Sequence, residues 1–517
     1  MGTSCSRSTK QTKENTRNRA RFSTESNSQI EKTTDVQEYH EEKTPTSTDS
    51  ISQVHFCLGS AEDVRKAYEI DTKVIGKGKF STVRKVSCQE DSSKLFCLKT
   101  VLLGSLSVNM HLQNMLSHEL HIMKNFHHPL IVKCFEAFND PKFVHFLMED
   151  LEGGDLFTYL FSKPNNVLTE KEAKNILYGV FAAVNFLHKN GIVHRDLKPE
   201  NLIFQDQTHT NLKLIDFGLS KDHQTKNMMT IVGSPLYVAP EVLSRKGYDQ
   251  KCDVWSLGVI LYLLLQGTVP FESAEIKELF EQIMNKPLEF VVSENISKEA
   301  KELIQLMLEK NPKKRISINE ALNHEFFREV RQNIAAQYSQ ISKEILEGIR
   351  KNITDLYSSS NVFHRLFAEY GLQNLENKEM KALDEAYKFF DRDLKGCISF
   401  EMFRQGIKDL GCKWSEEEIN KIFNYFAAED QKEISYQRFL ICFFENNKIW
   451  TKKNAKRLLA KKITKQGIRK YLERRMINYK EQDIEDFQKY VQLLMNLIEN
   501  DEEVEVKKIP QFCVNLH

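Results

Sequence analysis

The chain has 517 residues, of which 41% are hydrophobic and 28% charged, and its formal net charge is +1. This length exceeds what one hydrophobic core usually supports, so we expect two or more domains, and the ten scattered cysteines are typical of a reducing compartment. The balanced charge gives no overall reason to expect nucleic acid as a partner, and the longest apolar stretch, residues 255–265, is too short to span a bilayer.

The first 67 residues are polar, lack apolar periodicity and cannot bury enough surface to offset their ordering entropy, so we predict that residues 1–67 are disordered. The chain starts Met1-Gly2-Thr3-Ser4-Cys5-Ser6, the pattern of N-myristoylation at Gly2. One myristoyl chain binds membranes marginally, but palmitoylation of Cys5 or the basic residues that follow would supply a second signal. We therefore predict lipidation at Gly2 and Cys5, and a location at the cytoplasmic face of a membrane, with the plasma membrane favoured, and in the cytoplasm. An unmodified tail is the alternative.

From Tyr68 the pattern of apolar and polar residues changes to the alternation typical of strands, as in residues 96–99 and 143–148. Past Leu156 the pattern becomes helical and stays so, interrupted by loops that contain glycine. A small β-rich lobe followed by a larger α-rich lobe is therefore expected. After Phe327 the chain is almost wholly helical in pattern.

Glycines mark the start of a candidate nucleotide site, directly after a short strand-like run. The motif is Gly76-Lys77-Gly78-Lys79-Phe80-Ser81-Thr82-Val83. Glycines let backbone amides approach phosphates without an intervening side chain. A β-hairpin turn explains the motif equally well when it is considered alone. The candidate ATP-binding residues here are Gly76, Lys77, Gly78 and Val83.

Lys99 ends a strand-like run, where an ammonium group could reach phosphate oxygens. Glu119 follows 20 positions later in a helical stretch and could pair with it. An exposed lysine on a strand and a solvated glutamate on a helix are the plainer alternatives for each residue alone.

The run from His194 to Asn201, HRDLKPEN, decides between these alternatives, because Asp216-Phe217-Gly218 follows it after a strand-like segment. Phosphoryl transfer needs a carboxylate to orient the attacking hydroxyl and cations to neutralise the phosphates. Asp196 suits the first task, and Lys198 can steady the transferred group. Asn201 and Asp216 supply the hard oxygen ligands that Mg²⁺ prefers.

Residues 68–327 therefore resemble a eukaryotic protein kinase domain of the calmodulin-dependent group, and Lys198 with the segment 233–235 indicates Ser/Thr specificity. The resemblance implies that Glu149 and Leu151, after Met148, offer hinge backbone groups to adenine. It also implies that Asp155 faces the ribose or a substrate arginine, which with Glu200 would favour protein substrates with an upstream basic residue. Glu241 is expected to pair with Arg315, and Asp253 to anchor the catalytic loop.

Arg195 precedes the catalytic aspartate, where an arginine commonly pairs with a phosphate on the activation segment. Thr230 lies at the matching position, so phosphorylation of Thr230 is a candidate activation step. An ordinary loop threonine is an equal alternative.

The last third resembles the regulatory part of calcium-dependent protein kinases, with an autoinhibitory junction at 328–375 and an EF-hand-like lobe from 376. Asp391 and Asp393 fit positions 1 and 3 of the first twelve-residue loop. Lys395 places a cation where an oxygen ligand belongs, and Met402 replaces the bidentate glutamate. The second loop, the third hand and the fourth hand show no ligand set. We expect at most weak calcium binding, through Asp391 and Asp393.

Taken together, these patterns predict an α+β chain: a bilobal protein kinase fold followed by an all-α EF-hand-like regulatory lobe, residues 376–517, that acts on the kinase within the same molecule. The predicted activity is transfer of the ATP γ-phosphate, with Mg²⁺, to Ser or Thr of proteins, with calcium control weakened or lost. Activation by calcium through the first hand and a pseudokinase scaffold are the alternatives, and the intact catalytic set argues against the second. Basic residues at 448–475 could dock anionic lipid or an acidic partner, or form a solvated helix face.

Overall fold

The computed structural model describes residues 59–338 and 377–443 with short gaps at 61–63, 66–67, 79–80, 90, 103–115, 117, 124–125, 140–141, 218–219, 223–233, 245–246, 292–295, 393–395, 412–413 and 428–431. Four predicted site residues lie outside the described residues: Gly2, Cys5, Thr230 and Asp393. So do the chain after residue 443, which holds the basic stretch and the predicted third and fourth hands, and most of the predicted junction.

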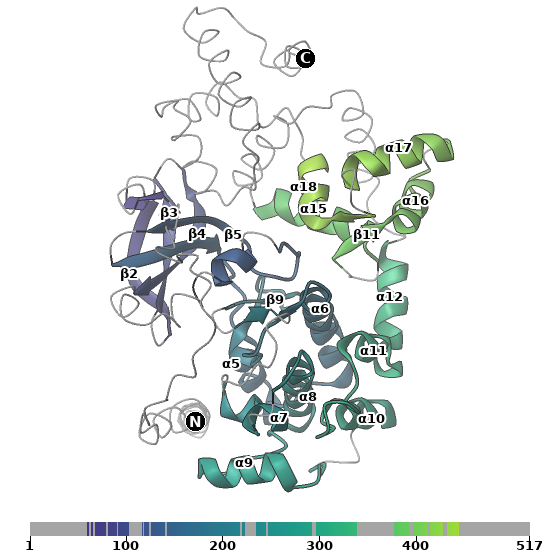
Figure 1. Cartoon of the computed structure of the whole chain (residues 1–517). Helices are drawn as coiled ribbons and strands as arrows, with labels where there is room; N and C mark the ends of the chain where they lie inside the picture. The colour runs from purple at the N-terminus through teal and green to yellow at the C-terminus, as the bar shows by residue number, and fades with distance from the viewer. Residues whose placement is uncertain are drawn as a thin grey trace, which may run out of the picture.

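The small lobe is built on a sheet that has six strands in the described residues, in the order β1-β5-β6-β4-β3-β2 (Figure 1). The strands are β1 (Gly59–Ser60), β2 (Tyr68–Lys77), β3 (Ser81–Cys88), β4 (Asp91–Leu102), β5 (Cys134–Asn139) and β6 (Phe143–Glu149). On β6, Val144 and Phe146 are buried and their neighbours Phe143 and His145 are half-buried. From Phe143 to Phe146 this is the period-two pattern that the sequence predicts for a strand, whereas Leu147 is buried as well because it packs in a second cluster, with Val64 and Tyr68.

The sequence analysis predicted disorder up to residue 67, but the folded small lobe already begins at β1. β1 pairs in parallel with β5, with Gly59 opposite Phe138. Val64 is buried in the same cluster as Tyr68. β1 therefore covers the β5 edge of the sheet, whose backbone groups would otherwise lack partners. A strand of two residues shows no periodicity in a sequence, so composition alone favoured disorder here.

The large lobe is mainly helical, as predicted. Its helices are α5 (Leu156–Phe161), α6 (Glu170–Lys189), α7 (Pro240–Leu243), α8 (Lys251–Gln266), α9 (Ile276–Asn285), α10 (Lys298–Met307), α11 (Ile318–Asn323) and α12 (Arg328–Tyr338). Its short strands are β7 (Ile192–Val193), β8 (Leu202–Phe204), β9 (Leu212–Leu214) and β10 (Lys221–Asp222), and its 3-10 turns are η1 (Pro164–Asn166), η2 (Pro199–Asn201), η3 (Pro235–Tyr237) and η4 (Glu325–Phe327). The pairs β8–β9 and β7–β10 flank the catalytic loop.

Two helices form the centre of the large lobe. A capping box starts α6, because the Thr169 hydroxyl accepts from the Glu172 N–H and the Glu172 carboxylate accepts from the Thr169 N–H. Helix α8 is buried from Cys252 to Gln266, as expected for the long apolar stretch. Gly267 ends it with a φ of 72°, a conformation that favours glycine.

The regulatory lobe contains two helix–strand–helix units in the described residues: α15 (Asn377–Phe390), β11 (Cys397–Ser399) and α16 (Phe400–Asp409), then α17 (Glu416–Ala427), β12 (Glu433–Ser435) and α18 (Tyr436–Phe443). β11 and β12 pair antiparallel, with Ile398 opposite Ile434, and both residues are fully buried. The expected fold, a bilobal kinase followed by an EF-hand-like lobe, is therefore confirmed for the described residues.

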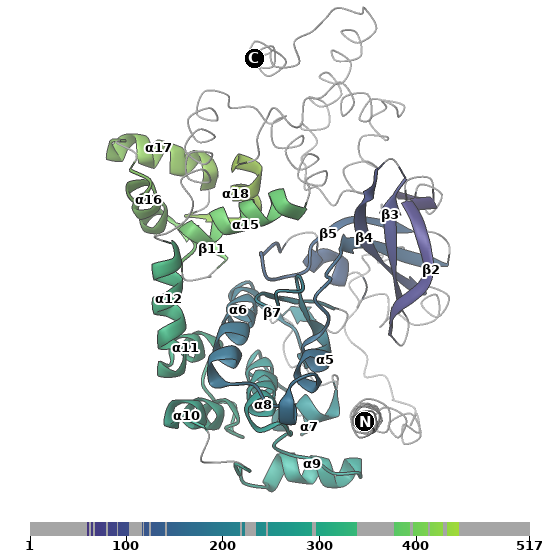
Figure 2. The same cartoon turned by 180° about the vertical axis from the view of Figure 1, so that it is seen from behind.

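The regulatory lobe lies beside the kinase domain at α6 and the segment before β5 (Figures 1 and 2). The contact involves Gly396, in the loop between α15 and β11. A Cβ atom there would lie 2.5 Å from Cδ2 of Phe186 and 2.7 Å from Cδ2 of His128. Only glycine fits this approach, and its φ of 77° also favours glycine.

Across the described residues, every helix falls short of the length or the hydrophobicity that crossing a bilayer requires.

Candidate active site

A cavity of about 1010 Å³ lies between the two lobes and gathers most of the predicted site residues. Its lining includes the predicted residues Gly76, Lys77, Gly78, Val83, Lys99, Glu149, Leu151, Asp155, Lys198, Asn201 and Asp216. The small lobe contributes strands β2, β3 and β4, and the large lobe contributes the catalytic loop and the segment after β9. Residues more than a hundred positions apart thus converge on one cleft.

Lys99 joins the two lobes at the back of this cleft. Its Nζ atom lies 2.6 Å from Oε1 of Glu119 and 2.9 Å from Oδ1 of Asp216. Burial lowers the pKa of Lys99, but the two carboxylates outweigh that effect and leave the pKa above its ordinary value. Lys99 is therefore a cation held where nucleotide phosphates would lie, and the predicted pair with Glu119 is present.

The catalytic loop holds Asp196 in a set of short contacts. Nζ of Lys198 lies 2.7 Å from Oδ2 of Asp196, and the amide nitrogen of Asn201 donates to the same oxygen at 3.1 Å. The hydroxyl of Ser234 donates to Oδ1 at 3.3 Å. A hydroxyl therefore already occupies a hydrogen-bonding position on this carboxylate, which is the geometry that an acceptor Ser or Thr needs.

Asp253 fixes the backbone of the catalytic loop, as predicted. Its two carboxylate oxygens accept from the backbone N–H groups of His194 at 2.9 Å and Arg195 at 2.8 Å, and Nε2 of His188 lies 2.8 Å away. Burial raises the pKa of Asp253, but these hydrogen bonds outweigh burial and bring the pKa below its ordinary value. Arg195 takes a φ of 67°, and this strain sits beside the catalytic Asp196.

The side chain of Arg195 has a described partner other than the activation segment. Its Nη1 atom donates to the hydroxyl of Tyr248 at 3.2 Å. The predicted partner, phosphorylated Thr230, lies outside the described residues. Phosphorylation of Thr230 therefore stays a prediction.

The glycine motif forms the β2–β3 turn and fits a phosphate-binding role. The Gly78 N–H donates to the Ser81 carbonyl at 2.8 Å, and a Cβ atom on Gly78 would lie 2.7 Å from Oγ of Ser81. A side chain would therefore fill the space at this turn. Ser81, which stands where a third glycine is usual, is accommodated because Gly78 leaves room for it.

Asn201 and Asp216 fit a magnesium site by their donor chemistry. The Asn201 amide nitrogen donates to the Asp196 carbonyl at 2.8 Å, which leaves the Asn201 side-chain oxygen to act as a ligand. Both residues line the cleft, and Asp216 supplies a carboxylate. Oxygen ligands of this kind, completed by substrate phosphates, are what Mg²⁺ prefers. When bound, the ion would neutralise charge on the transferred phosphate.

The hinge segment follows β6, and two of its predicted residues have structural roles as well. The Glu149 carboxylate contacts Nζ of Lys213 at 2.9 and 2.8 Å, so its side chain is an anchor rather than a nucleotide ligand. The Asp155 carboxylate caps α5, accepting from the Thr158 N–H at 2.7 Å and the Thr158 hydroxyl at 2.8 Å. Contact of Asp155 with ribose or a substrate arginine stays a prediction.

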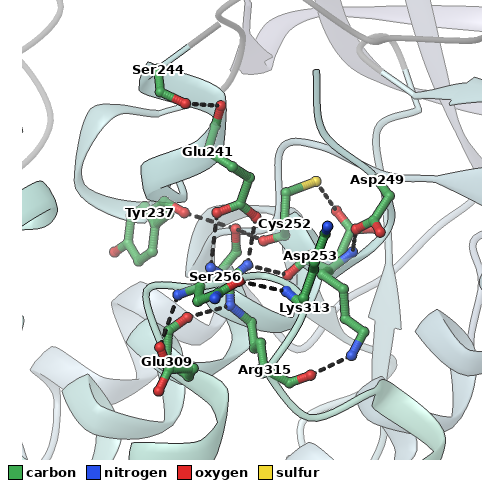
Figure 3. A network of polar contacts seen from close by, with 12 residues as sticks. Tyr237, Glu241, Ser244, Asp249, Cys252, Asp253, Ser256, Glu309, Lys313 and Arg315 are labelled. Atoms are coloured by element: carbon green, nitrogen blue, oxygen red, sulfur yellow. Dashed lines mark hydrogen bonds and ion pairs between the residues drawn. The ribbon is translucent and has the colours of Figure 1, made fainter. Parts of the chain in front are cut away.

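Glu241 and Arg315 form the predicted buried pair, at the centre of a network of polar contacts (Figure 3). Nη1 and Nη2 of Arg315 lie 2.6 and 2.8 Å from the two carboxylate oxygens of Glu241. The Arg315 side chain is fully buried, donates to the carbonyls of Glu309 and Lys251, and lies over the ring of Trp255. This bidentate contact ties the segment after Ser234 to the core of the large lobe.

The structure adds cleft residues that were not predicted as site residues. Asp150, Cys97 and Lys85 line the cavity, and the hydroxyl of Ser234 donates to the catalytic carboxylate. Glu200, noted in the sequence only by resemblance, has a buried Oε2 atom without a hydrogen-bond partner among the described residues, and burial raises its pKa. Sequence position beside the hinge was the only available signal for Asp150.

This fold and this set of side chains define a protein kinase. A model of the protein kinase domain matches residues 69–327. Curated relatives include calcium-dependent protein kinase 10 of Oryza sativa subsp. japonica, 33% identical over 71% of this chain and 61% of the relative. They also include calcium-dependent protein kinase 11 of Arabidopsis thaliana, 35% identical over 67% of this chain and 68% of the relative, and calcium-dependent protein kinase 2 of Zea mays, 32% identical over 75% and 74%.

The chain belongs to the calcium-dependent protein kinase family, and it is a protein serine/threonine kinase. The family match covers the kinase domain, where the catalytic residues Asp196, Lys198, Asn201 and Asp216 all stand. The alignment with the rice relative spans less than two thirds of that relative's length.

Proposed function

We propose that this kinase phosphorylates Ser or Thr residues that follow a basic residue, with calcium control weakened or lost. The observation that best supports weakened or lost calcium control is Met402, which stands at the last position of the first EF-hand-like loop. Its side chain has no oxygen, whereas calcium loops use a bidentate glutamate there. The active site meanwhile already holds the contacts between Lys99, Glu119 and Asp216.

The first loop uses its remaining polar groups for its own fold. Oδ2 of the fully buried Asp391 accepts from the Gly396 N–H at 2.7 Å. The Ser399 hydroxyl accepts from the Met402 N–H at 3.3 Å and so caps α16. Arg392 pairs with Asp409. These contacts support a loop that folds as a packing element in the absence of metal.

Calcium activation through the first hand is the second candidate. Asp391 keeps the position of the first ligand of such a loop. The relatives that this chain resembles are named calcium-dependent. A calcium response of the purified protein would favour this candidate.

We propose that the regulatory lobe acts on the kinase domain of its own chain. Gly396 packs on Phe186 of α6, and Asp384 of α15 lies near the hinge anchor Lys213. Burial lowers the pKa of Lys213, but the carboxylates of Glu149 and Asp384 outweigh burial and raise it. The Tyr436 hydroxyl bonds Asp384. The lobe thus places the carboxyl group of Asp384 near the residue that holds the hinge.

Glu200 supports the preference for basic substrates. Its unpartnered oxygen lies in the cleft with the Asp155 carboxylate nearby, and both line the cavity. A substrate arginine would give this buried oxygen a charge-assisted partner.

The purified full-length protein should therefore phosphorylate a Ser peptide with an upstream arginine about ten-fold faster, in kcat/KM, than the same peptide with alanine there, because a charge-assisted hydrogen bond is lost. The assay is run in calcium chelator. Equal rates on the two peptides would contradict the preference, and no transfer to either peptide would contradict the proposed independence from calcium.

We also propose that acylation at Gly2 and Cys5 attaches the protein to the cytoplasmic face of a membrane. The sequence Gly2-Thr3-Ser4-Cys5-Ser6 and the basic residues after it support a two-signal anchor. Gly2→Ala should move most of the protein from the membrane to the soluble fraction on cell fractionation, with Thr3→Ala as the matched control. Unchanged membrane retention of Gly2→Ala would rule out this anchor.

A further inference from the structure

Asp150, the second residue of the hinge pair Glu149-Asp150, is held by two groups of the small lobe. Its side chain is only 2% exposed. Nζ of Lys85 lies 2.7 Å from Oδ2, and Sγ of Cys97 lies 3.3 Å from Oδ1. Each carboxylate oxygen therefore has its own donor.

The two donors come from neighbouring strands that form the roof of the cleft. Lys85 on β3 lies opposite Cys97 on β4, and Cys97 lies opposite Met148 on β6. Cys97 is two residues before Lys99 on the same strand, so it shares the face that carries the phosphate-binding lysine. Lys85, Cys97 and Asp150 all line the nucleotide cavity.

The charges of the cluster favour the contacts that the geometry shows. The hydrogen bond to Asp150 raises the pKa of Lys85, which keeps the ammonium charged. Burial, with the Asp150 carboxylate, raises the pKa of Cys97 to about 12. The thiol is therefore protonated at neutral pH and can donate to Asp150.

Glu149, the residue before Asp150, is held by other partners. The Glu149 carboxylate accepts from Lys213 on β9 and from the Lys133 backbone N–H at 2.7 Å. Adjacent hinge residues are thus bound to the large lobe on one side and to the small-lobe roof on the other. Leu151 follows Asp150 directly and lines the same cavity.

We propose that Lys85 and Cys97 are positioning residues that act through Asp150 to fix the hinge backbone for adenine binding. The cluster sets affinity for the nucleotide and does not take part in phosphate transfer. This role rests on the kinase activity shown by the family match. It involves residues that the phosphate-binding and catalytic motifs do not contain. Preorganising the hinge lowers the cost of ordering it when nucleotide binds.

The test is the steady-state kinetics of Lys85→Met in the full-length protein, with ATP varied. Methionine keeps the length of the side chain but removes the cation. We expect the KM for ATP to rise roughly three- to ten-fold, as suits a charge-assisted bond that is partly exposed, with kcat changed less than about two-fold. Lys85→Arg keeps the cation and should therefore have a KM for ATP close to that of the wild type. The Kd of a non-hydrolysable ATP analogue, measured directly, should rise by the same factor as KM.

Lys163→Met is the matched control, because Lys163 forms a similar pair with Glu172 at 3.0 Å outside the cavity. It should leave the KM for ATP unchanged. A folded Lys85→Met protein with normal KM, or with lowered kcat and normal KM, would overturn the proposal. If Lys85→Met does not fold, Cys97→Ala removes the second donor alone and should raise KM about two-fold, because this donor is an uncharged thiol. An unchanged KM in Cys97→Ala would then overturn the proposal.

Discussion

Replacing Asp196 with asparagine is expected to lower kcat for phosphate transfer by about 10²- to 10⁴-fold, the contribution that a positioned general base commonly makes. Asparagine has nearly the same shape but cannot accept the proton of the substrate hydroxyl. It also removes the charge that holds Lys198 at 2.7 Å. The measurement is incorporation of labelled phosphate into a Ser peptide by wild-type and variant protein.

Nucleotide binding serves as the control for Asp196→Asn. Lys198 and Asn201 line the nucleotide cavity, whereas Asp196 is not among its lining residues. The Kd of a non-hydrolysable ATP analogue should therefore change less than about three-fold, because the variant loses an interaction made in the transition state. Incorporation at more than a tenth of the wild-type rate, in a variant free of contaminating kinase, would show that Asp196 is not the base.

Replacing Arg315 with methionine is expected to lower the free energy of unfolding by about 3–5 kcal/mol, the usual cost of removing one member of a buried ion pair. The Glu241 carboxylate would stay buried without its bidentate partner. The carbonyls of Glu309 and Lys251 would also lose a donor. Urea denaturation followed by tryptophan fluorescence measures the change, because Arg315 lies over Trp255.

A double variant separates the pair from general damage to the fold. Adding Glu241→Gln to Arg315→Met removes the unpaired buried charge, so the double variant should be more stable than Arg315→Met alone. Arg328→Met, at an exposed pair with Glu325, is the matched control and should leave the urea midpoint nearly unchanged, because solvent screens this pair. A small effect of Arg315→Met, or an additive double variant, would contradict the role of this pair.

The catalytic residues were predictable because each carries its chemistry in a short motif. Asp196 and Asn201 stand five positions apart in one loop, and Asp216 follows the next strand pair. Two longer-range pairs were also predicted: Lys99 with Glu119, because phosphoryl-transfer sites use such a lysine–glutamate pair, and Glu241 with Arg315. The structure places both pairs within hydrogen-bonding distance.

Other features depend on tertiary contacts that no local pattern records. Asp150 meets Cys97 and Lys85 across 53 and 65 positions of the sequence, and only the strand register brings them together. Gly396 lies in the EF-hand-like loop that begins at Asp391, but its close approach to Phe186 depends on how the regulatory lobe docks. The two-residue strand β1 is too short to leave a periodic pattern.

The central claim is that an assembled kinase site works without calcium, and one titration tests it most directly. Phosphorylation of the arginine-containing Ser peptide by full-length protein is measured with free calcium buffered from chelator to saturation, alongside Asp196→Asn. We predict that the wild-type rate in chelator is within about two-fold of the rate at saturation, because Met402 removes the bidentate ligand that calcium loops use. A steep rise with calcium, absent in Asp196→Asn, would contradict the claim and show that the loop at Asp391 still forms a working site.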